Sequence, residues 1–99
     1  MHGNDSQMLA LTVLAGGPLH GYAINTAIEE LTGTKLGPGS LYGALARLEA
    51  RGLIEPFGEH DRQRPVRLTE AGRAALQVEL EQMARVSRAG LSYLGVVAT

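Results

Sequence analysis

The sequence predicts a mainly α-helical fold with one small β-hairpin, and three observations lead to this prediction. Residues 38–50 carry apolar side chains at the helical spacing i, i+3, i+4 and i+7: Leu41, Ala44, Leu45 and Leu48. Two short strand-like runs, 53–57 and 64–68, flank a polar loop. A heptad-like apolar pattern then extends from Thr69 to about residue 94. A chain of 99 residues is enough for one domain with a modest core.

Composition excludes several classes of protein. The chain has no cysteine, which excludes disulfides and thiolate metal sites and suits a reducing, cytoplasmic location. No apolar run reaches membrane-spanning length, and the N-terminus lacks the basic-then-apolar pattern of a signal peptide, so no membrane association is expected. The formal net charge of −1 argues weakly against a nucleic-acid partner. However, residues 35–67 hold more basic than acidic side chains, whereas the rest of the chain has the opposite balance.

The first expected helix is apolar around almost its whole circumference. Residues 1–4 are polar and expected to be disordered, and Asp5 or Ser6 can cap the helix that follows. The apolar residues of this helix are Met8, Leu9, Leu11, Val13 and Leu14. A helix of this kind is buried on more than one side. In a domain this small, we expect the second side to face a partner subunit.

The next two helices are short and closely connected. Gly16-Gly17-Pro18 ends the first helix, and Gly33 ends the second. The inward face of the second helix is expected to consist of Ile24, Ala27, Ile28 and Leu31. Pro38 and Ser40 mark the start of the third helix, and Gly52 marks its end.

The outer face of the third helix is small in the middle and polar at its edges. Its middle consists of Gly39, Gly43, Ala46 and Ala50. Ser40, Tyr42 and Arg47 flank that strip. Such a face lets the helix backbone approach another molecule closely, so we interpret it as a recognition helix in the major groove of DNA. The alternative is an ordinary amphipathic helix, which is common in small helical domains.

The hairpin completes a winged helix-turn-helix pattern. Pro56 restricts the first strand to a sheet edge, and Val66 and Leu68 lie on one side of the return strand. The loop between them, residues 58–63, is polar and charged, as expected for a wing that touches DNA. A surface loop with solvated charges is the alternative reading.

The last helix is expected to be longer than the compact domain, or head, that the preceding residues form. Thr69 is a capping residue, and Glu70 lies at the positive end of the helix dipole. A helix over 69–94 is roughly 39 Å long at about 1.5 Å per residue, so its surplus apolar surface should pair with a second copy. The sequence thus predicts a DNA-binding head over 5–68 and a dimerisation helix over 69–96. The expected interface residues are Met8, Leu76, Leu80, Met83, Leu91 and Leu94, and the seam of the helix also includes Ser87 and Gly90.

Four segments in register resemble the PadR family of bacterial transcriptional regulators. They are Gly17-Pro18-Leu19-His20-Gly21-Tyr22-Ala23-Ile24, Gly37-Pro38-Gly39-Ser40-Leu41-Tyr42, the run 45–54 (LARLEARGLI) and Arg67-Leu68-Thr69-Glu70-Ala71-Gly72. The resemblance covers about residues 8–90. It implies a winged helix-turn-helix, and the single C-terminal helix resembles the short subfamily, whose members dimerise through it and repress transcription.

The sequence departs from this family at three places. Gly43 stands where the family commonly has proline after the helix tyrosine, on the face expected to fit the groove. Pro65-Val66-Arg67 stands where paired tyrosines are frequent, in the return strand of the wing. Met83 stands where some members have a tryptophan that stacks on flat aromatic ligands.

The leading hypothesis is a dimeric repressor that binds an inverted repeat in double-stranded DNA. Lys35, Arg62 and Arg64 are expected to contact phosphates together with the helix starts, whereas Ser40, Tyr42 and Arg47 are candidates for base contacts. His20, Tyr22 and Gly43 complete the expected DNA surface. The alternative hypothesis is a winged-helix module that binds another protein, without direct contact to DNA.

An enzyme is not expected, because the glycine-rich segments lack the context of a nucleotide loop. No metal or cofactor is expected either, since His2, His20 and His60 have no metal-ligand spacing. A small hydrophobic or aromatic effector could occupy a cavity at the dimer axis. Its expected lining is Gln7, Leu11, Leu80, Met83 and Ser87. In the alternative, Met83 fills a closed interface.

Overall fold

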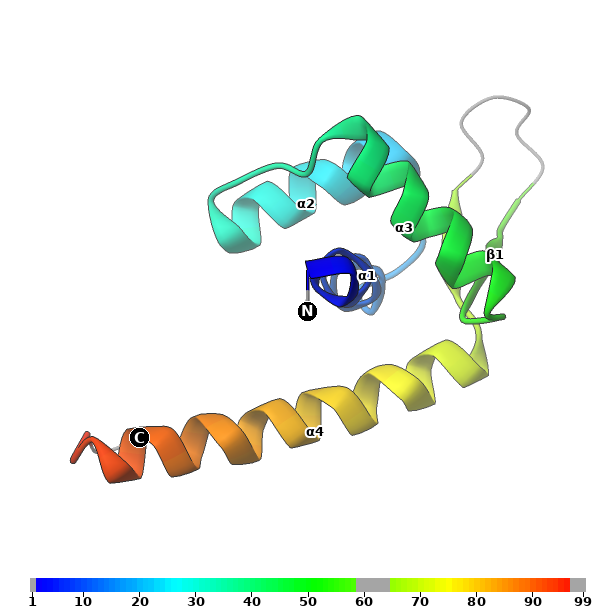
Figure 1. The fold of residues 1–99 in the computed structure, drawn as a ribbon. Coiled ribbons are helices and arrows are strands. Elements are labelled where there is room, and N and C mark those ends of the chain that lie inside the picture. The colour runs from blue at the N-terminus through cyan, green and yellow to red at the C-terminus, as the bar shows by residue number, and fades with distance from the viewer. Residues whose placement is uncertain (1, 59–64, 97–99) are drawn as a thin grey trace.

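Four helices and a two-stranded hairpin make up the protein. The structure is a computed structural model that describes residues 2–58 and 65–96, with side chains described from Ser6 onwards. Along the chain the elements are α1 (His2–Leu14), α2 (Gly21–Thr32), α3 (Pro38–Ala50), β1 (Ile54–Pro56), β2 (Val66–Leu68) and α4 (Glu70–Tyr93) (Figure 1). This arrangement confirms the predicted mainly α-helical fold with one hairpin.

Helix α1 is the centre of the fold. It contacts α2, α3, β2 and α4, and Figure 1 shows it end-on between the α2–α3 pair and α4. Ala10, Leu11 and Leu14 are buried there. Within the single chain, α4 and β2 contact α1 in addition to α2 and α3. Met8 and Leu9 remain half-buried, so a partner on this helix stays a prediction.

The start of α1 also differs from the prediction. The helix begins at His2, so residues 2–4 are helical rather than a disordered start. Asp5 and Ser6 lie within the helix and therefore cannot cap it.

Helix α2 is buried through only part of its predicted face. Ile24 and Ile28 are completely buried, and Gly33 ends the helix with a φ of 86° and an N–H bond of 2.7 Å to the carbonyl of Glu29. The prediction of Leu31 as an inward residue was wrong, because its side chain is 57% exposed. The last turn of α2 runs beyond the core in Figure 1, so the helical period alone overextends the buried face.

Helix α3 follows the predicted pattern closely. Pro38 occupies its first turn after Gly37, and the buried residues are Leu41, Ala44 and Leu48. Gly52 follows the helix end with a φ of 75°, a backbone conformation that favours glycine. The core of the chain therefore fixes which face of α3 remains outside.

The hairpin pairs antiparallel, with Ile54 opposite Leu68 and Pro56 opposite Val66. Ile54 and Leu68 are buried, which agrees with the predicted inner side of the return strand. Leu19, in the segment before α2, adds a third partner that the sequence did not reveal. Its N–H donates to Val66 over 3.1 Å and its carbonyl accepts from Val66 over 2.9 Å. These two bonds attach the wing to the start of α2.

Helix α4 begins after β2 and ends beyond the head (Figure 1). Thr69 caps it as predicted, since the hydroxyl accepts a hydrogen bond from the Gly72 N–H over 3.0 Å. Leu76 is 4% exposed and packs in the core of its own chain, although the sequence assigned it to the dimer interface. Leu76 is the last buried residue of α4, and the rest of the helix passes α1 and continues beyond the head (Figure 1).

Candidate nucleic-acid interface

The starts of α2 and α3 both present free backbone N–H groups. Neither His20, before α2, nor Gly37, before α3, makes a capping side-chain bond among the described residues, and neither first turn contains an acidic residue. The unpaired N–H groups and the helix dipole favour an anion at such a position. Both helix starts are therefore suited to bind phosphate groups.

Tyr42 brings the second turn of α3 against the start of α2. A Cβ atom placed on Gly21 would lie 2.9 Å from the phenol oxygen of Tyr42. The absence of a side chain at Gly21 thus makes room for the Tyr42 ring, which is itself 57% exposed. Two residues from separate sequence segments meet here and form one surface.

Lys35 extends this surface along α2. Its ammonium lies 5.6 Å from the centroid of the Tyr22 ring and 4.0 Å from a carboxylate oxygen of Glu29. Both charged side chains are about half exposed, so this ion pair is weak and its geometry is easily changed. The Lys35 ammonium therefore remains available to a phosphate.

Arg47 lies along the outer face of α3. A Cβ atom on Gly43 would lie 3.3 Å from a terminal nitrogen of the Arg47 guanidinium. Gly43 therefore gives the guanidinium room to lie close to the helix backbone one turn earlier. Ser40 and Ala46 are exposed on the same outer side, so the predicted face with a small centre and polar edges is present.

Asn25 orients α3 relative to α2, and the sequence did not reveal this role. Its side-chain amide donates to the Leu36 carbonyl over 2.8 Å and accepts from the Leu36 N–H over 2.9 Å. These two hydrogen bonds fix the connection between the two helices. The only signal in the sequence was a polar residue on the half-buried side of α2.

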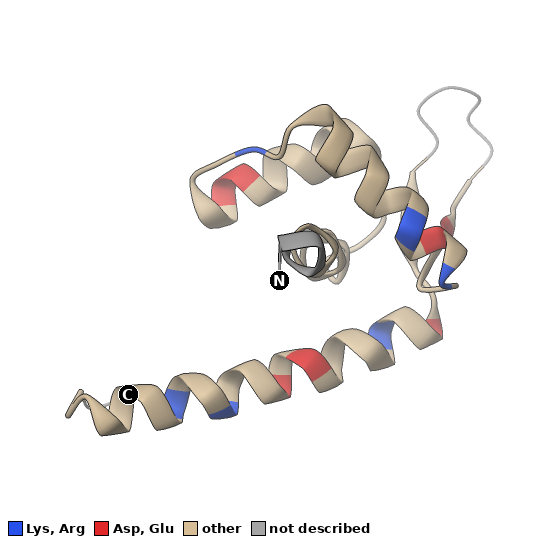
Figure 2. Ribbon diagram, viewed as in Figure 1, with Lys and Arg blue, Asp and Glu red and all other residues tan. Residues whose placement is uncertain are grey.

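The wing is described only at its base. Arg67 donates to Glu55 over 2.9 Å, and its guanidinium lies 4.6 Å from the centroid of the Phe57 ring. Arg62, Arg64 and His60 lie outside the described residues. Figure 2 shows α4 with both signs of charge along its length, whereas the first half of α3 carries none.

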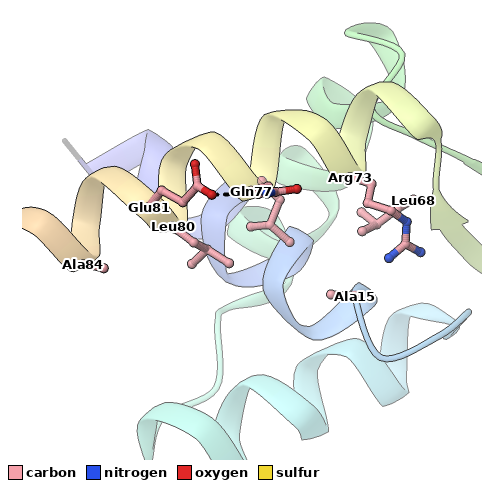
Figure 3. Close-up of a pocket in the computed structure, with 8 residues that line it drawn as sticks. Ala15, Leu68, Arg73, Gln77, Leu80, Glu81 and Ala84 are labelled. Atoms are coloured by element: carbon pink, nitrogen blue, oxygen red, sulfur yellow. Dashed lines mark hydrogen bonds between the residues drawn. The ribbon is translucent and has the colours of Figure 1, made fainter. Parts of the chain in front are cut away.

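The residues predicted to bind an effector are divided among three hollows of the single chain. Gln7 and Leu11 line a hollow of about 180 Å³ with Arg51, whose guanidinium donates to the Gln7 side chain. Met83 and Ser87 line a hollow of about 540 Å³ on one side of α4. Leu80 lines a third hollow, of about 330 Å³, between the end of α1, β2 and α4 (Figure 3). The chain alone does not bring the five residues together.

The far half of α4 exposes a row of apolar side chains. Leu80 is 40% exposed and Met83 54%, and Leu94, directly after the helix, is 79% exposed. Several exposed apolar side chains in one row indicate a surface that another molecule covers. Of the predicted interface residues, Met8 and Leu91 are half-buried.

Within residues 2–58 and 65–96, no helix combines the length and the apolar composition that a membrane span requires. In the same part of the chain, no three His, Asp or Glu side chains are grouped so that they could hold a metal ion.

The chain is similar to known transcriptional regulators. Residues 10–78 match the model of the transcriptional regulator PadR-like family. A 37.1 kDa protein in transposon Tn4556 of Streptomyces fradiae is 63% identical over 87 residues, which are 88% of this chain and 25% of that protein. The chain therefore spans about a quarter of the length of this relative.

Solved structures share the fold. A PadR family transcription regulator from Clostridium difficile R20291 has a TM-score of 0.79 at 21% identity, covering 90% of this chain and 97% of that one. RosR of H. salinarum has a TM-score of 0.72 at 31% identity, covering 94% of this chain and 78% of that one. Together with the match over residues 10–78, these similarities show that the chain belongs to the PadR-like family of transcriptional regulators.

Proposed function

We propose that the protein binds double-stranded DNA sequence-specifically, as a homodimeric repressor on an inverted-repeat operator in the bacterial cytoplasm. One observation carries the DNA-binding part: three contacts bring together residues that were expected to touch DNA. Lys35 lies over Tyr22, Arg47 lies against Gly43, and Tyr42 lies against Gly21, the neighbour of Tyr22. These contacts cover the start of α2 and the outer side of α3, and the first-turn N–H groups of both helices are free to bind phosphate.

The chemistry of each side chain on this surface indicates whether it would contact a base or a phosphate. Arg47 can make a bidentate contact with guanine, and Ser40 and Tyr42 can bond to base edges. Lys35 is a point charge, and together with the helix starts and His20 it would hold phosphates. Gly43 would allow the backbone of α3 to enter the major groove closely.

Selection of binding sites from random duplexes, followed by a salt titration on the selected duplex, tests this proposal. Affinity for DNA should fall steeply and log-linearly with salt, because phosphate contacts release counterions. The acidic net charge supports the alternative, a winged-helix module that binds another protein. Failure to enrich any sequence, with weak salt dependence of whatever binding remains, would favour that alternative.

We propose that the protein dimerises because α4 carries exposed apolar side chains. Met83 and Leu94 are exposed, and Leu80, which lies next to the head, is 40% exposed. A second copy would bury these side chains. Two heads that read one side of a duplex are about 34 Å apart, so the operator should be an inverted repeat with that period. Light scattering at micromolar concentration should give the mass of a dimer.

A small hydrophobic effector is proposed to act at this interface. Met83 and Ser87 line an apolar hollow that a second copy could close, and Gln7 and Leu11 line another nearby on α1. A ligand there would shift the dimer only by as much as it prefers one geometry over the other. Titration of ring-containing compounds against the wild type and Met83→Ala, with and without operator, tests this. Binding that never alters operator affinity would make the interface purely structural.

A further inference from the structure

The first turn of α4 is in direct backbone contact with the residues that follow α3. A Cβ atom placed on Gly72 would lie 1.9 Å from the carbonyl oxygen of Leu53 and 2.9 Å from its carbonyl carbon. The φ of Gly72 is not positive, so its backbone conformation does not require glycine. The close contact with Leu53 does.

Thr69 reinforces the same contact with three hydrogen bonds. Its N–H donates to the Leu53 carbonyl over 3.0 Å, and its hydroxyl donates to the Gly52 carbonyl over 2.7 Å. The hydroxyl also accepts from the Gly72 N–H over 3.0 Å. We call residues 52–53 and 69–72 the joint.

The joint is attached firmly to α3 on its other side. The Gly52 N–H donates to Glu49 and the Leu53 N–H donates to Leu48, each over 3.0 Å. Both acceptors belong to the last turn of α3. Because these bonds involve only the backbone and the short hydroxyl side chain of Thr69, the joint fixes the angle between α3 and α4 without long, flexible side chains.

Beyond the joint, α4 acts as a lever. Leu76 is the last buried residue of this helix, and the 17 residues from there to its end span about 26 Å. A tilt of only about 10° at the joint would move the far end by about 4 Å over that length. One base-pair step is about 3.4 Å, so such a tilt changes which half-site spacing a dimer fits.

We propose that Gly72 and Thr69 are specificity-determining residues, which set the operator spacing by fixing the angle between the recognition helix and the dimerisation helix. This inference rests on the proposed function. Alanine at position 72 would have to move α4 by about 1 Å, since real Cβ atoms do not approach another atom within 3.0 Å. With Leu76 as pivot, about 6 Å along the helix, that displacement corresponds to a tilt of about 10°.

The test compares Gly72→Ala with the control Ala74→Ser, which lies in the same turn of α4. Ala74 is exposed and lies outside the expected dimer seam, so the added hydroxyl should disturb neither the joint nor the dimer. Affinity is measured for the selected operator, for a duplex with one half-site, and for operators whose spacing differs by one or two base pairs. Gly72→Ala should lose about tenfold or more on the full operator, because its second head no longer meets its half-site. Its affinity for the single half-site should stay within about twofold, and its preferred spacing should shift.

Several outcomes would overturn the proposal. Equal losses on the full operator and the half-site would mean that the change damages the recognition helix itself. An unchanged affinity and spacing would mean that the joint does not set the geometry. If the wild type binds no duplex at all, the proposed function fails, and that result is distinct from either outcome.

A distance measurement without DNA gives an independent readout. The chain has no cysteine, so spin labels at Glu30→Cys and Ser92→Cys report the distance between α2 and the end of α4. Labelled chains are diluted with unlabelled ones so that only distances within one chain are seen. Gly72→Ala should shift this distance by several ångströms, and Ala74→Ser should not. If Gly72→Ala does not fold, Thr69→Val, which lacks the hydroxyl, is compared with Thr69→Ser, which keeps it. An unchanged distance in the folded variant refutes the proposal.

Discussion

Helix α1 and the far half of α4, residues 77–93, each carry a row of apolar side chains, yet the two rows end in opposite situations. Ala10, Leu11 and Leu14 of α1 are at most 4% exposed within a single chain. Met83 and Val86 of α4 are 54% and 73% exposed. The comparison shows that an apolar pattern predicts that a face is buried but does not say which chain buries it.

The width of the polar face distinguishes the two helices. From Ser6 to its end, α1 carries no charged residue, and its Thr12 hydroxyl bonds back to the Met8 carbonyl over 2.7 Å. In contrast, the far half of α4 carries Glu79, Glu81, Arg85 and Arg88. A helix without a polar face has to be enclosed, whereas a helix with one needs a partner on one side only.

The largest expected effect comes from a change in α1, the buried helix of this pair. Leu14→Ala should lower the free energy of unfolding by about 2–5 kcal/mol, because it leaves a cavity in the core. Leu31→Ala is the matched control, since Leu31 is 57% exposed and lies outside the proposed dimer interface, and it should have little effect on stability. Urea unfolding followed by circular dichroism measures both. Equal effects of the two changes would contradict the assignment of α1 as the core helix.

The next largest effect is on dimerisation and comes from changes in the exposed far half of α4. Leu80→Asp and Met83→Asp should each weaken dimerisation by about 2 kcal/mol or more, because a carboxylate would be buried without a partner. Ser92→Asp introduces the same charge elsewhere on α4 and should leave the dimer intact. Light scattering across a dilution series separates these cases. A wild type that is monomeric at micromolar concentration would exclude the dimer itself.

Local patterns were sufficient to predict most of the fold. The period of apolar residues, the cap at Thr69 and the glycines at 33 and 52 each depend on neighbours within a few residues, and each prediction is confirmed. Leu19 pairs with Val66 across 47 positions of the chain, and no local pattern signals such a contact. At Leu31 the local pattern predicted a contact that does not exist. The residue follows the helical period of the buried side chains, but it lies beyond the core and is exposed.

The sequence was sufficient to predict which residues form the surface of the candidate site. It did not predict the contacts that hold the helices of this site in place. Tyr42 and Arg47 were found from the pattern of α3, and both lie on its outer side. The bonds of Asn25 to Leu36 and the contact of Gly72 with Leu53 were not predicted. These contacts join segments that are distant in the sequence, so only the folded chain reveals that a common residue such as glycine has a specific role there.

The comparison extends to α3, whose exposed face is small and polar rather than apolar, as expected for DNA instead of a second copy. Arg47→Ala should weaken specific binding by about 1–3 kcal/mol and relax the choice of base at one position. Arg88→Ala, on α4, is the control and should change neither. Competition between the selected operator and random duplexes measures the effect. An equal loss on both kinds of DNA would reassign Arg47 to phosphate contact.

The smallest expected effect sharpens the distinction between base and phosphate contacts on this same surface. Lys35→Gln removes a charge that is held only by a half-exposed pair with Glu29 at 4.0 Å and by the Tyr22 ring. Because such pairs contribute about 0–1 kcal/mol, the stability of the fold should hardly change. If the Lys35 ammonium moves to a phosphate on binding, the slope of log affinity against log salt should become shallower by about 1. The loss should be the same for operator and random duplexes, unlike that of Arg47→Ala. A salt slope equal to the wild type would show that Lys35 stays with Glu29 and that the DNA surface ends at Tyr42.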